Sequence, residues 1–72
     1  MNKTIRDLCY EYTDDLKFYD PDSGQTIVIL EEKYLFELTA RARKINFACT
    51  HSSRLTNGCV LARYQKINKY QI

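Results

Sequence analysis

Residues 16–30 read LKFYDPDSGQTIVIL, and this stretch predicts a β-hairpin. Apolar, aromatic and β-branched residues, which favour strands, occupy residues 16–19 and 26–30. Between them Pro21 presets one turn dihedral angle, and Gly24 accepts a positive φ. We therefore expect two antiparallel strands joined by a turn at residues 20–25.

A short amphipathic helix is expected before this hairpin, over residues 4–13. Four apolar residues recur at the spacing of one helical face: Ile5, Leu8, Cys9 and Tyr12. Thr4 followed by Asp7 fits a capping box that has a shorter acid in its third position. Asp14 and Asp15 then interrupt the pattern, so the helix should end before them.

A second helix is predicted over residues 31–45. Its acidic start and basic end complement the helix dipole, with Glu31 and Glu32 first and Arg41, Arg43 and Lys44 last. One apolar stripe runs along it: Leu35, Leu38, Ala42 and Ile45. Residues 36–42 also alternate as a strand would, but Glu, Leu, Ala and Arg favour the helix.

Residues 45–67 fit two structures. Asn57-Gly58 between residues 47–55 and 59–67 is a hairpin signal. A helical stripe also runs through Val60, Leu61, Tyr64 and Ile67, and Thr56 or Asn57 could cap that helix. We favour a loop around Ser52 and Ser53 followed by a C-terminal helix, with the second hairpin as the alternative. Either way the expected fold is a small α+β domain spanning residues 1–72.

The length and composition point to a small intracellular protein. A chain of 72 residues forms one domain with a marginal core, so a partner or a homodimer would help to hold it together. No apolar run approaches the roughly 20 residues of a membrane span, and residues 1–7 lack the apolar segment of a signal peptide. Three cysteines, an odd number, do not suggest a disulfide framework. We therefore expect no membrane contact and a cytoplasmic location.

Charge is divided sharply along the chain. Residues 1–40 carry four basic and nine acidic side chains, whereas residues 41–72 carry seven basic side chains and no acidic one. Such asymmetry indicates a polyanionic partner for the basic half. The alternative is that the two halves neutralise each other within the fold.

Two functions follow from this pattern. The first is a non-enzymatic nucleic-acid-binding regulator, because Lys and Arg neutralise phosphates and Tyr stacks on bases. Its expected contacts are Arg41, Arg43, Lys44, Arg54, Arg63, Lys66, Lys69 and Tyr70. Residues 38–57 do not fit the helix-turn-helix template that many DNA-binding proteins use.

The second function is a protein-binding modulator, an inhibitor or adaptor of a larger host enzyme or complex. The acidic segment between Asp7 and Glu37 would then meet the partner. The abundance of Asn, Lys, Ile and Tyr is typical of AT-rich genes such as those of bacteriophages and mobile elements. Such genes often encode small proteins that redirect host machinery.

Catalysis and metal binding are not expected. Cys9, Cys49, His51 and Cys59 are the right types for zinc, but Cys49 and His51 are spaced too closely for the usual ligand pair. A cysteine nucleophile needs a base and an oxyanion hole within a pocket, and this short chain offers little material for one. We therefore expect no enzyme activity, metal or cofactor.

Overall fold

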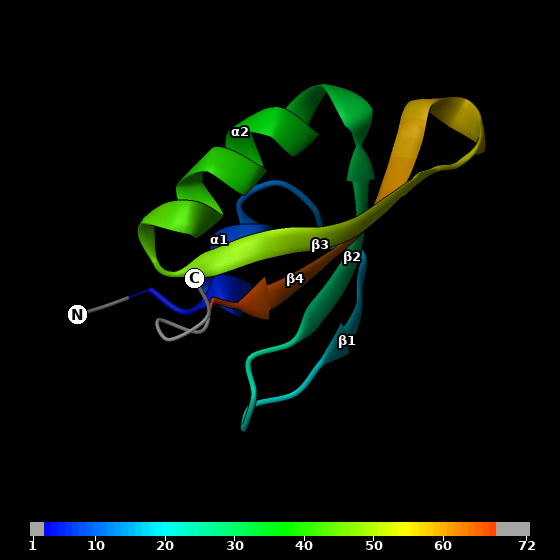
Figure 1. Ribbon diagram of the computed structural model, residues 1–72. Coiled ribbons are helices and arrows are strands. Elements are labelled where there is room, and N and C mark those ends of the chain that lie inside the picture. The colour runs from blue at the N-terminus through cyan, green and yellow to red at the C-terminus, as the bar shows by residue number, and fades with distance from the viewer. Residues whose placement is uncertain (1–2, 68–72) are drawn as a thin grey trace.

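Two hairpins and two helices make up the computed structural model, which describes residues 3–67 (Figure 1). In chain order the elements are α1 (Ile5–Tyr10), β1 (Leu16–Tyr19), β2 (Thr26–Glu31), α2 (Glu32–Lys44), β3 (Phe47–Arg54) and β4 (Cys59–Lys66). A short 3₁₀ turn, Thr56–Gly58, joins the last two strands. The α+β class and the first hairpin are thus confirmed.

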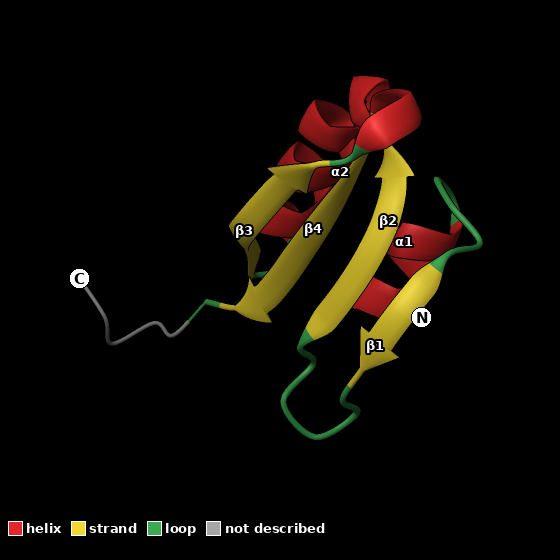
Figure 2. Cartoon of the chain, turned by 90° about the vertical axis from the view of Figure 1, so that its right-hand side faces the viewer, coloured by secondary structure: helices red, strands yellow, loops and turns green. Residues whose placement is uncertain are grey.

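The four strands form one antiparallel sheet in the order β1-β2-β4-β3. Strand β4 lies between β2 and β3, so β2 and β3 run in the same direction with α2 as the crossover between them. Both helices cover the same face of the sheet, and Figure 2 shows the other face bare. Strands β1 and β3 are the edges, and β3 is the longer.

Local sequence signals explain both helices. The predicted capping box forms at the N-terminus of α1, where the Asp7 amide donates to the Thr4 hydroxyl at 3.1 Å. Helix α1 ends at Tyr10, earlier than expected, and residues 11–13 continue as turns. Helix α2 follows β2 directly and ends before Asn46, whose φ of 68° lies in the left-handed region that Asn tolerates.

The preferred C-terminal helix is wrong, and the alternative second hairpin is correct. Ser52 and Ser53 belong to β3 rather than to a loop. In β4 the buried residues alternate, with Val60, Ala62 and Tyr64 facing the helices. Asn57 and Gly58 both adopt positive φ angles, 68° and 75°, and so make the turn that their sequence indicates.

The core lies between the sheet and the two helices. Its buried residues include Ile5, Leu8 and Cys9 of α1, Leu38 and Ala42 of α2, and Val28, Leu30, Val60, Ala62 and Tyr64 of the sheet. The fully buried Tyr64 shares a hydrogen bond of 2.9 Å with the Thr39 hydroxyl. No helix in residues 3–67 is long and apolar enough to cross a membrane.

The bare face of the sheet is partly apolar. Ile27, Ile29 and Leu61 point away from the helices and are partly exposed. Phe18 of β1 is the cross-strand partner of Ile27 in β2 and has 46% of its surface exposed. Arg63 and His51 continue the same row of cross-strand neighbours, so this face is mixed in character.

Candidate functional site

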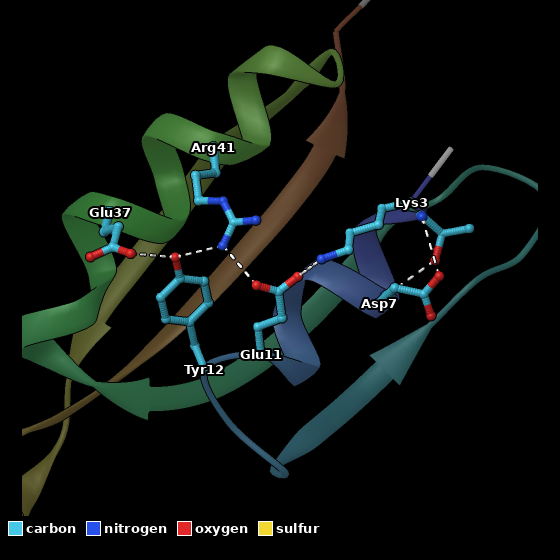
Figure 3. Close-up of polar contacts among 7 residues, drawn as sticks. Lys3, Asp7, Glu11, Tyr12, Glu37 and Arg41 are labelled. Carbon is cyan, nitrogen blue, oxygen red and sulfur yellow. Dashed lines mark hydrogen bonds and ion pairs between the residues drawn. The ribbon is translucent and has the colours of Figure 1, made fainter. Parts of the chain in front are cut away.

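The basic residues predicted as phosphate contacts do not share one face. Arg41 points from α2 toward α1, where its guanidinium donates to Glu11 at 2.8 Å and to the Tyr12 hydroxyl at 2.9 Å (Figure 3). The Tyr12 hydroxyl in turn donates to Glu37 at 2.7 Å, and Lys3 forms an ion pair with Glu11. Arg41 is therefore engaged in holding the two helices together.

Electrostatics within this cluster follow from its contacts. Hydrogen bonds from Arg41 and Lys3 lower the pKa of the Glu11 carboxyl. Loss of solvent and the hydrogen bond to Glu37 raise the pKa of the Tyr12 hydroxyl. The Glu11 carboxylate and the Tyr12 hydroxyl together raise the pKa of Arg41. At neutral pH Glu11 is therefore anionic, Tyr12 is uncharged and Arg41 is cationic.

Arg54 and Arg63 also have partners within the fold. Arg54 forms an ion pair of 2.9 Å with Glu32 at the start of α2. Arg63 lies on the bare face of the sheet and donates through its Nε to the Thr50 hydroxyl at 3.2 Å. Arg41 and Arg54 thus pair with acids from the first half of the chain, as expected if the two halves neutralise each other.

Arg43, Lys44 and Lys66 have no ion-pair partner within residues 3–67. Lys66 lines one surface hollow and Lys44 lines another, and Lys3 borders both. The two lysines therefore lie at the same end of the molecule. Lys69 and Tyr70 lie outside the described residues.

Within residues 3–67 the fold does not bring the cysteines and the histidine together as a set of metal ligands. Burial of Cys9 in the core raises the pKa of its thiol to about 12. The Cys49 thiol donates to the backbone carbonyl of His51, whereas the imidazole pairs with the Ser53 hydroxyl at 2.8 Å. Within residues 3–67, no three His, Cys, Asp or Glu side chains gather as metal ligands would.

A mostly apolar hollow of about 470 Å³ lies between α2 and β3. Helix α2 contributes Glu32, Leu35, Phe36, Thr39, Ala40 and Arg43 to it, and β3 contributes Cys49. Phe36 has 88% of its surface exposed, the largest value among the exposed large apolar residues described. We call the hollow, together with the outer edge of β3, the α2–β3 surface.

Strand β3 presents an open backbone edge beside this hollow. No strand in the described part of the chain pairs with its outer side. At the two ends of β3, Asn46 and Leu55 direct their backbone groups inward: the Ile67 amide donates to the Asn46 carbonyl, and the Leu55 amide donates to the Cys59 carbonyl. The pairing of β3 with β4 shifts by one residue at a β-bulge between Cys49 and His51. Because the direction of backbone groups alternates along an antiparallel ladder, those of Phe47 and Cys49 before the bulge, and of Ser52 and Arg54 after it, point outward.

Comparison with known proteins finds no matching family model, no matching curated protein and no matching solved structure.

Sequence reasoning missed the α2–β3 surface, although one signal for Phe36 was present. On the predicted helix the apolar stripe runs through Leu35, Leu38 and Ala42, and Phe36 projects well outside it. A phenylalanine off the core stripe of an amphipathic helix marks a candidate contact. The open edge of β3 has no comparable signal, because strand order depends on pairing between distant segments.

Proposed function

We propose that this chain is a protein-binding modulator that acts by occupying a surface of a larger protein through its α2–β3 surface. The observation that carries the proposal is the exposed ring of Phe36 beside a mostly apolar hollow. Interfaces concentrate aromatic anchors at their centres, where a few residues supply most of the binding energy.

Of the exposed large apolar residues described, Phe36 has the most surface left to bury. Burying such a side chain fully is worth about 1.5–3 kcal/mol, and the isolated chain does not gain it. On the bare sheet face Phe18 has 46% of its surface exposed, and Ile27, Ile29 and Leu61 are partly covered, so these residues offer less new burial than Phe36. The α2–β3 surface is therefore the stronger candidate for a partner.

The test is quantitative affinity capture from the source cell with the tagged wild-type chain and with Phe36→Ser. We expect a stoichiometric protein partner with the wild type and about tenfold weaker capture with the variant, in line with an interface anchor. Absence of a stoichiometric partner, or capture that does not depend on Phe36, would contradict the proposal.

A matched control is Tyr10→Ser, which also removes an exposed aromatic ring from a helix, one with 48% of its surface exposed. Tyr10 lies on α1, outside the α2–β3 surface, so this variant should capture the partner as the wild type does. Circular dichroism on both variants checks that the fold is kept.

Nucleic-acid binding remains a second candidate, which Lys44 and Lys66 favour. These two cations lie at one end of the molecule and have no acidic partner within residues 3–67. Mobility shift across a salt series should show binding that weakens with salt and with the charge reversals Lys44→Glu and Lys66→Glu. No shift at low salt, where counterion release favours binding most, would exclude this function.

A further inference from the structure

We propose that the α2–β3 surface binds an extended segment of a partner protein as a fifth strand on β3, with one apolar side chain in the hollow and a carboxylate at Arg43. This inference rests on the proposed protein-binding function and specifies the chemistry of the partner. Three features carry it: the open edge, the position of the hollow and the distribution of charge.

The edge supplies the backbone contacts. Cys49 and Ser52, on either side of the bulge, direct their backbone N–H and C=O groups away from β4. Such unpaired groups are a template for strand addition, in which main-chain hydrogen bonds give affinity. The outward positions of β3 therefore fix where an added strand would pair.

The hollow supplies a site for a side chain of the added strand. Cys49 pairs with the buried Tyr64, so its side chain lies on the helix-covered face of the sheet and borders the hollow. Neighbouring residues on paired strands project to the same face. A residue added opposite Cys49 would thus point into the hollow, toward Leu35 and Phe36 of α2.

Charge around the hollow favours an acidic segment. Glu32 at one end of the hollow is neutralised by Arg54 at 2.9 Å. Arg43 at the other end is exposed and has no acidic partner in residues 3–67, and Lys44 follows it. A carboxylate on the same face of the added strand, two residues from the apolar one, complements Arg43.

A second copy of this chain complements the hollow less well. The helix-facing side chains of β3 after the bulge are those of Ser52 and Arg54, which are polar. Phe47 is already packed against Gly24, since an added Cβ there would lie only 2.8 Å from its ring. Pairing of two β3 strands would therefore offer the hollow no apolar side chain larger than that of Cys49.

The probe is a displayed library of random dodecapeptides, selected on the immobilised full chain. We expect selected peptides to share an apolar residue and an acid two positions away. Arg43→Glu should weaken these peptides at least about tenfold, because like charges then meet, whereas Lys33→Glu, a reversal elsewhere on α2, should not. Failure to enrich any peptide, or equal binding by both variants, would overturn the proposal.

Backbone pairing is tested on the best peptide. Peptides N-methylated at successive positions should lose binding at alternate residues only, and the amides of Cys49 and Ser52 should become protected from hydrogen exchange. Binding that tolerates methylation everywhere and protects no β3 amide would overturn strand addition. If Phe36-dependent capture of a cellular protein persists in that case, the proposed function stands and only this inference fails. A stable homodimer that blocks the peptides would overturn it in favour of a second copy.

Discussion

At the scale of single residues, the hydrogen bond between Tyr64 and Thr39 ties a fully buried side chain of the sheet to a helix. It joins β4 to α2 at 2.9 Å, and burial raises the pKa of the Tyr64 hydroxyl so that it stays protonated. Tyr64→Phe and Thr39→Val should each cost about 1 kcal/mol of unfolding free energy, because each leaves a polar group without its partner.

The double variant tests whether this loss is shared. Because both substitutions remove the same bond, their costs in urea unfolding should sum to more than that of the double variant. Strict additivity would show that the two hydroxyls contribute independently, contrary to the geometry.

Glu11 gives a second prediction at the residue scale. Its pKa is lowered in the folded chain, so its carboxylate stabilises the fold above the unfolded pKa of about 4.3. That contribution is lost as the pH falls through the lower folded value. The urea midpoint of the wild type should therefore drop between about pH 5 and pH 3 more steeply than that of Glu11→Gln.

Asp14→Asn is the matched control for this pH dependence. Asp14 is exposed and forms no ion pair within the described residues, so its loss should leave the steep acid dependence in place. Equal slopes for the wild type and Glu11→Gln would mean that the cluster around Arg41 does not stabilise the fold.

At the scale of elements, the two glycine turns differ in a testable way. Gly58 has a φ of 75° with no atom near an added Cβ, so Gly58→Ala should cost only the left-handed strain, about 1–2 kcal/mol. Gly24 has a φ of 79° and also faces the Phe47 ring at 2.8 Å. Gly24→Ala should therefore lower the thermal midpoint more than Gly58→Ala, and the reverse order would contradict this packing.

Elements were predictable wherever the local signals agreed. Capping by Thr4, the turn at residues 20–25 and the dipole-matched charges of α2 each indicated one structure. Strand β4 was not, because a helical spacing through Val60, Leu61 and Tyr64 competes with the strand-like alternation of Val60, Ala62 and Tyr64. Pairing with β2 on one side and β3 on the other decides for the strand, and that pairing is a property of the tertiary fold.

At the scale of the whole molecule, the charge split is in part internal. Arg41 and Arg54, both from the basic half, pair with Glu11 and Glu32 of the acidic half. Composition could predict that the halves carry opposite charge, but it could not predict which cations remain unpaired. Among the described residues, Arg63 lies on the bare sheet face, Arg43 borders the hollow of the α2–β3 surface, and Lys44 and Lys66 lie at one end of the molecule.

The α2–β3 surface also depends on the whole fold. Phe36 and Cys49 come from different elements, and they border one hollow only because α2 crosses beside the edge strand. A homodimer remains a prediction, and sedimentation of the purified chain over a range of concentrations measures it.

Hydrogen exchange of the purified chain, alone and in complex with its captured protein partner, tests most directly whether the α2–β3 surface is the binding surface. We expect protection to be gained on complex formation in α2 and along β3, with β1 and β2 unchanged. Protection confined to β1 and β2, with the amides of α2 and β3 unchanged, would contradict the proposed surface.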